Sequence, residues 1–219
     1  NWKDEVVNYD KLRGKFKKIE GYVMFPSSHD ITPRNLELSL KFLNNILKPD
    51  NNVLIVTKPH FEVIEKICEN FYHQRKNILF RFTIGSCNSH VLKFWEPNAP
   101  SFEERLKSLK FAYNNGFKTS VSCEPILDTK TEALVNILIP YITDAIWIGK
   151  PNFLLRRLKM NGITDLETLK KAKELVVLQS DRWIVELYNK HKRNSKIKWK
   201  ESIKKIVNIE IPTVKGLDE

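Results

Sequence analysis

The sequence predicts an α/β protein built on a parallel β-sheet, with a partial (β/α) barrel as the favoured architecture. Five short apolar segments alternate with amphipathic helical patterns at roughly the spacing of βα units. Each crossover between parallel strands needs a helix, and the handedness of such crossovers places the helices on one side. Polar residues follow every segment, at the edge where barrels carry their sites, so we prefer a barrel to a doubly wound sheet.

The five predicted strands are residues 21–25, 52–57, 78–84, 117–123 and 145–149. Thr32 can cap the first helix, and Cys68 lies on the apolar stripe of the second, where we expect it to pack in the core. After the third strand comes a long polar and aromatic loop, then a helix from Ser101 to about residue 115. This helix opens with a capping box, because Glu104 follows Ser101 by three residues. Asp128 or Thr129 can cap the fourth helix.

The rest of the chain is expected to be helical. Thr164 and Glu167 form another capping box, Ser180 caps a further helix, and a basic segment leads into a last amphipathic helix containing Ile203. We predict one domain over 1–219, made of a charged lead-in (1–20), the βα units (21–155) and a helical C-terminal part (156–219).

Composition limits the classes of function. No apolar run approaches the roughly 20 residues that span a membrane, and no signal peptide is visible, so we expect a cytoplasmic protein without a membrane partner. The three cysteines form no C-x-x-C pair, which argues against a zinc site or a disulfide framework.

A net charge of +11 favours a nucleic-acid partner. The abundance of lysine, asparagine and isoleucine offers a second explanation, nucleotide bias. The oligomeric state cannot be read from the sequence.

Candidate ligand-binding residues gather where the predicted strands end. Because parallel strands share one carboxyl edge, these side chains should converge on one mouth. Hydroxyls, carboxylates, a lysine and an arginine suit a ligand with an amino-acid head and a ribose. The candidates are Ser27, Ser28, His29, Asp30, Lys58, Arg81 (if it points into the barrel), Thr83, Ser86, Glu124 and Asn152.

Each candidate also has a structural interpretation. Ser27 and Ser28 are ordinary turn residues, and His29 and Asp30 can simply lead into a helix. Lys58 follows a buried strand and must either pair with a carboxylate or bind an anion.

Cys123 is the candidate catalytic residue, and it has two interpretations. Beside Glu124 at a strand end, its thiol can serve as a hydrogen-atom donor or a nucleophile. Nothing nearby in the sequence lowers its pKa, which favours a quiet thiol.

Several segments carry a resemblance to a known family. The run WEPNAPSFEERL (95–106) is preceded by RFTIGS and followed by FKTSVSCEPILD, and the segments MFPSSHDITP, VLIVTKP and IWIGKPN lie around them. Together they resemble the spore photoproduct lyase-like branch of radical S-adenosylmethionine enzymes, over most of residues 20–155. The Glu-Pro loop at residue 96 is fairly specific in this combination.

The resemblance implies a partial (β/α)6 barrel that holds S-adenosylmethionine across the strand ends. It places residues 27–30 near the methionyl amino group and Lys58 near the methionyl carboxylate. Thr83 and Ser86 are placed near the ribose or carboxylate, and Cys123, Glu124 and residues 149–152 near adenine and substrate.

The sequence departs from this family in one respect. The C-x-x-x-C-x-x-C loop that ligates a 4Fe–4S cluster is not in the sequence, so the resemblance implies that the first βα unit is missing and that the full-length protein carries the cluster. We expect no radical activity from these 219 residues alone. The alternative is a non-catalytic basic α/β module that binds nucleic acid. A third possibility combines the two: the full-length enzyme acts on nucleic acid, as the lesion-repair members of the resembled family do.

Overall fold

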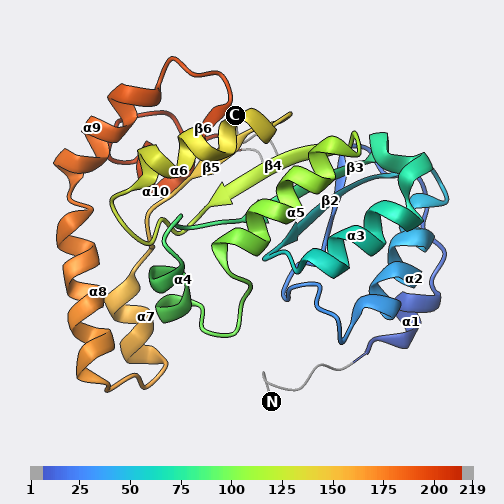
Figure 1. Ribbon diagram of the computed structural model, residues 1–219, viewed down its shortest axis with the longest axis horizontal. Coiled ribbons are helices and arrows are strands. Elements are labelled where there is room, and N and C mark those ends of the chain that lie inside the picture. Colours follow the sequence, from blue (N-terminus) through green and yellow to red (C-terminus); the bar gives the residue numbers. More distant parts are fainter. Residues whose placement is uncertain (1–6, 214–219) are drawn as a thin grey trace.

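The computed structural model describes residues 7–213 and shows a six-stranded sheet with all strands parallel (Figure 1). The strand order follows the chain from β1 to β6, and β1 and β6 are the two edges. The strands are β1 (Tyr22–Phe25), β2 (Asn52–Thr57), β3 (Ile78–Thr83), β4 (Lys118–Cys123), β5 (Ile146–Ile148) and β6 (Ile197–Trp199). The α/β class and the five predicted strands are confirmed.

The helices α2, α3 and α5 lie side by side along the sheet (Figure 1). This arrangement follows from a sequential strand order, in which every right-handed crossover returns on the same side. The helices and 3-10 turns are α1 (Tyr9–Arg13), α2 (Leu36–Leu47), α3 (Phe61–Asn70), η1 (Tyr72–Asn77), α4 (Ser89–Trp95), α5 (Phe102–Asn114), α6 (Thr131–Leu138), η2 (Ile139–Tyr141), α7 (Leu154–Met160), α8 (Leu166–Leu178), α9 (Asp181–His191) and α10 (Glu201–Lys204).

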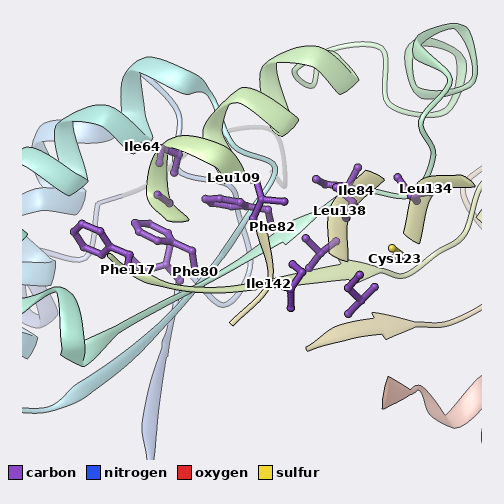
Figure 2. Packing of buried hydrophobic residues seen from close by; sticks show 14 of the residues in the cluster. Ile64, Phe80, Phe82, Ile84, Leu109, Phe117, Cys123, Leu134, Leu138 and Ile142 are labelled. Atoms are coloured by element: carbon purple, nitrogen blue, oxygen red, sulfur yellow. The ribbon is translucent and has the colours of Figure 1, made fainter. Parts of the chain in front are cut away.

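The hydrophobic core fills the space between the sheet and these helices (Figure 2). Phe80 and Phe82 point from β3 toward the helices, and the ring of Phe80 lies 5.4 Å from that of Phe117. Alternation along the strand sends Arg81 and Thr83 to the opposite face. That face is more polar, and at its β1 edge Tyr22 and Met24 are exposed.

The C-terminal part is not wholly helical, which corrects the prediction for residues 156–219. β6 pairs in parallel with β5, with Ile146 opposite Ile197 and Ile148 opposite Trp199. The strand is three residues long and lies in a lysine-rich segment, so its apolar alternation is too short to distinguish from a helix start. The amphipathic helix expected around Ile203 is only the short α10.

Several predicted helix starts are also corrected. Asn35, and not Thr32, precedes α2, because Thr32 donates its backbone N–H to the Asn35 side chain in a turn. Asp165 caps α8 by accepting from Thr168 N–H at 2.7 Å, one residue after the predicted cap. Lys130 precedes α6, although Asp128 does accept its N–H.

The region after β3 is not one long loop, since residues 89–95 form α4. Asn88 caps it, accepting from His90 N–H at 2.9 Å. The predicted Ser101 and Ser180 caps are confirmed. In the described part of the chain no helix is long and apolar enough to cross a membrane.

Candidate functional site

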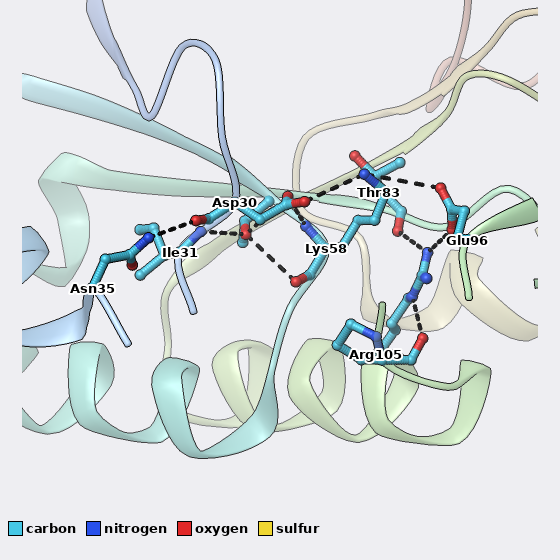
Figure 3. Close-up of polar contacts among 9 residues, drawn as sticks. Asp30, Ile31, Asn35, Lys58, Thr83, Glu96 and Arg105 are labelled. Carbon is cyan, nitrogen blue, oxygen red and sulfur yellow. Dashed lines mark hydrogen bonds and ion pairs between the residues drawn. The ribbon is translucent and has the colours of Figure 1, made fainter. Parts of the chain in front are cut away.

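Asp30 ties the loop after β1 to the end of β2 (Figure 3). Its Oδ1 accepts the backbone N–H of Lys58 at 2.7 Å and the hydroxyl of Thr57 at 3.3 Å. The same Thr57 hydroxyl accepts from Ile31 N–H at 3.1 Å. One carboxylate oxygen therefore fixes the position of the first two strand ends relative to each other.

Lys58 lies between two carboxylates. Its Nζ is 3.3 Å from Asp30 Oδ2 and 3.9 Å from Glu96 Oε1. Of the two predicted outcomes for a lysine at this strand end, pairing is the one observed. The longer distance to Glu96 leaves the ammonium only loosely held on that side.

Glu96 belongs to the loop after α4 and is held by a buried arginine from α5. Its Oε2 lies 2.8 Å from Nη1 of Arg105, whose side chain is fully buried. Arg105 also donates to the carbonyl oxygens of Pro100 (2.8 Å) and Thr83 (3.0 Å). These bonds offset part of the cost of burying the guanidinium, whose Nη2 makes no hydrogen bond to a described residue, and they fix the loop 96–100 against the end of β3.

The four charged side chains alternate in sign along the edge of the sheet, as Figure 3 shows: Asp30, Lys58, Glu96, Arg105. A pocket of about 420 Å³ opens beside the first three. This volume lies in the range of small-molecule sites. The pocket is lined by Asp30, Thr32, Lys58, His60 and residues 95–100.

Thr32 lines the pocket, but its hydroxyl faces away from it. The hydroxyl oxygen is buried and makes no hydrogen bond to any residue that the structure describes, so a ligand in the pocket does not reach it.

The other candidates from the first loop do not line this pocket. Ser27, Ser28 and His29 are exposed, and the His29 ring packs edge-on against Phe25 at 6.3 Å. Asp30 and Lys58 are therefore the predicted pair that the structure brings together at the pocket.

Thr83 and Ser86 have structural contacts at the end of β3. The Thr83 carbonyl accepts from Arg105, and its side chain is half-buried. Ser86 is fully buried, donates its hydroxyl to Asp128 and accepts from Asn88 N–H at 2.8 Å. These bonds hold the loop that leads into α4.

Arg81 lies on the sheet face opposite the helices. It donates to Ser120 Oγ at 3.1 Å, pairs with Asp144 at 3.3 Å and stacks on the Trp147 ring at 5.0 Å. Asp144 precedes β5, so the guanidinium leans toward the amino end of the strands and away from the pocket.

Glu124 belongs to a second cluster, at the ends of β4, β5 and β6. Its Oε2 is 3.5 Å from Lys200 Nζ, and Lys200 also stacks on Trp147. Gly149 makes room for both side chains, because a Cβ there would lie 2.9 Å from Lys200 Cβ and 3.1 Å from Glu124 Cγ. Asn152 is exposed beyond β5.

Cys123 is fully buried in the hydrophobic core (Figure 2), as the quiet-thiol interpretation expected. Burial, with a smaller contribution from Asp128, raises the pKa of its thiol to about 12. Cys68 is buried on α3 as predicted, and burial raises its pKa to about 12 as well. Burial and Asp128 also raise the pKa of the half-buried Cys87.

Sequence reasoning missed Thr32, His60, Glu96 and Arg105 as members of the site. His60 lies 3.7 Å from Glu104, through Nδ1, and lines the pocket. Glu96 was noted only as part of the Glu-Pro loop, and nothing in the sequence pairs it with Arg105 nine residues later. The available signal was an arginine at helical spacing from the apolar residues Phe102, Leu109 and Ala112 of α5.

No group of three or more His, Cys, Asp or Glu side chains among residues 7–213 could hold a metal ion. Comparison of the chain with protein-family models, curated proteins and solved structures finds no match.

Proposed function

We propose that this chain is the S-adenosylmethionine-binding part of a radical S-adenosylmethionine enzyme, with the pocket beside Lys58 receiving the methionyl head of the ligand. The observation that carries the proposal is the convergence of Asp30 and Lys58, from two adjacent strand ends, on one pocket of suitable size. The sequence resemblance places the same two residues beside the methionyl group.

The pocket residues fit such a ligand chemically. The Lys58 ammonium would pair with the methionyl carboxylate, and the Asp30 or Glu96 carboxylate would accept from the amino group. Trp95 adds an aromatic group to the walls. A zwitterion suits a pocket whose own charges alternate in sign.

The partial-barrel form of the sheet is part of the same proposal. The Tyr22 hydroxyl on β1 lies 3.5 Å from Lys118 Nζ on β4, although two strands separate them. Three strand spacings of about 4.8 Å make about 14 Å across a flat sheet. Because the tyrosine and lysine side chains are both long, the contact is compatible with a flat or a curved sheet, and the barrel form rests on the sequence resemblance.

The described residues do not fit a 4Fe–4S cluster. Cys68 and Cys123 are buried in the core, and no metal-binding group is found among the residues that the structure describes. We therefore propose ligand binding for these 219 residues and derive no cleavage step.

Isothermal titration of the chain with S-adenosylmethionine tests the proposal, with methionine and adenosine titrated separately. Replacing Asp30 would also disturb the loop that it holds in place, so Lys58→Met is the more specific test of ligand binding. Loss of a charge-assisted hydrogen bond, worth about 1.5–3 kcal/mol, should weaken binding roughly ten- to hundredfold. Lys196→Met is the matched control, because Lys196 is half-buried, bonds the Ile142 carbonyl and precedes β6 at the opposite edge.

Absence of binding at millimolar ligand would contradict the proposal. So would an equal loss of affinity in the Lys58 and Lys196 variants, because that result would indicate a general effect of removing charge.

A nucleic-acid-binding module is the second candidate, favoured by the net charge of +11. Phosphate contacts release counterions, so binding of a labelled DNA duplex should weaken log-linearly with salt. Fluorescence anisotropy over a salt series measures this, and no binding at low salt excludes the candidate.

A further inference from the structure

The two carboxylate oxygens of Glu96 have different surroundings. Oε2 is sealed from solvent and lies 2.8 Å from the Arg105 guanidinium, whereas Oε1 is open to solvent and points toward Lys58 (Figure 3). Lys58 Nζ is 3.9 Å from Oε1, a distance that allows an ion pair but exceeds that of a hydrogen bond. No residue among 7–213 donates a hydrogen bond to Oε1. Because Glu96 lines the pocket, Oε1 is the free acceptor that a ligand can reach.

The backbone around Glu96 is fixed. Ala99 N–H donates to the Glu96 carbonyl at 3.0 Å, which closes a four-residue turn with Pro97 at the second position, where its restricted φ is favourable. Arg105 holds the two ends of this segment through the Glu96 carboxylate and the Pro100 carbonyl. A carboxylate held in this way loses little conformational freedom when a ligand binds, so its free oxygen is preorganised.

The charges of the pocket leave Glu96 the less neutralised carboxylate on the ligand side. Asp30, Lys58 and Glu96 are the aspartate, glutamate and lysine side chains that line the pocket. Lys58 Nζ lies closer to Asp30, at 3.3 Å, than to Glu96, at 3.9 Å. Arg105 neutralises Glu96 from the other side, but its side chain is fully buried and does not line the pocket. The unmet charge that faces a ligand is therefore negative.

Asp30 is already engaged by the protein. Its Oδ1 accepts from Lys58 N–H and from the Thr57 hydroxyl, and its Oδ2 pairs with the Lys58 ammonium. The Asp30 side chain is 35% exposed, against 15% for Glu96, so water screens its charge more strongly. Residues 27–29, which the sequence resemblance places near the amino group, do not line the pocket. A ligand ammonium therefore gains more at Glu96.

We propose that Glu96 is the specificity-determining residue of the pocket, whose free Oε1 accepts from the protonated amino group of the ligand while Lys58 pairs with the ligand carboxylate. This inference rests on the proposed function, because it assigns a role within the same pocket. Since Oε1 and Nζ lie only 3.9 Å apart, the two charged groups on one α-carbon can meet both. The pocket should then select α-amino acids over carboxylic acids that lack the amine.

Isothermal titration with two ligands tests the inference: S-adenosylmethionine and its deaminated analogue, in which hydrogen replaces the amino group. The unmodified chain should bind S-adenosylmethionine about ten- to hundredfold more tightly than the analogue, the usual value of a charge-assisted hydrogen bond. Glu96→Gln should lower this ratio about five- to tenfold, because a neutral amide is the weaker acceptor. A general disturbance of the pocket would weaken both ligands alike, so the ratio isolates the contact.

Two further variants serve as comparisons. Asp30→Asn should weaken both ligands together and keep the ratio, because Asp30 acts through the loop and Lys58. Glu69→Gln is the matched control, since it removes the same charge from an exposed glutamate that pairs with Lys66 at the far end of α3. Both affinities should match those of the unmodified chain. Circular dichroism of every variant checks that the fold is kept.

The outcomes separate this inference from the proposed function. If the unmodified chain binds S-adenosylmethionine and Glu96→Gln leaves the ratio unchanged, the proposed function stands and the inference is overturned. Loss of the ratio in Asp30→Asn alone would also overturn it and assign the amino group to Asp30. If neither ligand binds the unmodified chain, the proposed function fails and the inference fails with it.

Discussion

At the scale of single residues, Gly85 marks the point where the loops after β3 and β4 come into contact. Leu127 N–H donates to the Gly85 carbonyl at 2.9 Å. A Cβ at position 85 would lie 2.5 Å from the Pro125 carbonyl oxygen and 3.0 Å from the Leu127 side chain. The backbone oxygen cannot move without displacing the loop that follows Glu124.

We therefore expect Gly85→Ala to lower the free energy of unfolding by about 1–3 kcal/mol, the usual cost of overpacking. Urea denaturation measures the change. Ser27→Ala, at an exposed position, should stay within about 0.5 kcal/mol of the unmodified chain. Equal midpoints for both variants would show that the two loops are not packed as described.

The buried cysteines give a pH dependence of defined sign. The pKa values of Cys68 and Cys123 are raised to about 12, above their ordinary value near 9. Between these values the folded state binds more protons than the unfolded state, so stability falls as pH rises. We expect the urea midpoint to decrease from about pH 9 upward, and a Cys68→Ala, Cys123→Ala variant to lose part of this slope.

Reactivity of the thiols checks the same assignment. Without denaturant, Ellman's reagent should leave Cys68 and Cys123 unmodified, whereas the half-buried Cys87 should react slowly. Rapid modification of Cys123 in the folded chain would restore it as a candidate nucleophile.

At the scale of elements, Glu104 of the predicted capping box on α5 caps the neighbouring helix α3. Ser101 accepts the Glu104 N–H at 3.3 Å, as the capping box predicts. The Glu104 carboxylate instead crosses to α3, where its Oε1 accepts the Phe61 N–H at 2.9 Å. The His60 side chain that precedes α3 makes no capping bond, so α5 supplies the cap of its neighbour.

Glu104→Ala should lower the free energy of unfolding by about 1 kcal/mol, the typical value of an N-cap. Glu104→Gln keeps an acceptor oxygen and should lose less, mainly the favourable interaction of a carboxylate with the helix dipole. Urea denaturation of both variants compares them. No effect from Glu104→Ala would mean that water satisfies the Phe61 N–H equally well.

These elements also show what the sequence could and could not predict. The five predicted strands carry apolar or β-branched runs that local pattern identifies. Lys58 follows β2 directly, and Asp30 lies in the loop after β1. β6 has three residues, and Arg105 reaches Glu96 through a loop whose path depends on tertiary packing. Local periodicity detects neither a three-residue strand nor an ion pair that depends on tertiary packing.

At the scale of the whole molecule, burial divides the chain into a sheet core and a peripheral hairpin formed by α7 and α8. Every residue of β4 after Lys118 is buried, whereas α7 buries none. Local opening requires little free energy where few apolar contacts are lost, and approaches global unfolding where many are lost. The same contrast in burial separates the loops of the pocket, which are anchored to strand ends, from the α7–α8 hairpin.

Hydrogen exchange followed by mass spectrometry should therefore show a gradient across the chain. Peptides from α7 should exchange first, because this helix contains no buried residue, and peptides from β3 and β4 should exchange last, with protection near the global free energy of unfolding. Peptides from 96–106 should resemble the sheet, since the fully buried Arg105 ties this segment to the Thr83 carbonyl. If α7 and β4 exchanged together, the α7–α8 hairpin would unfold only with the sheet, and the division into core and periphery would be wrong.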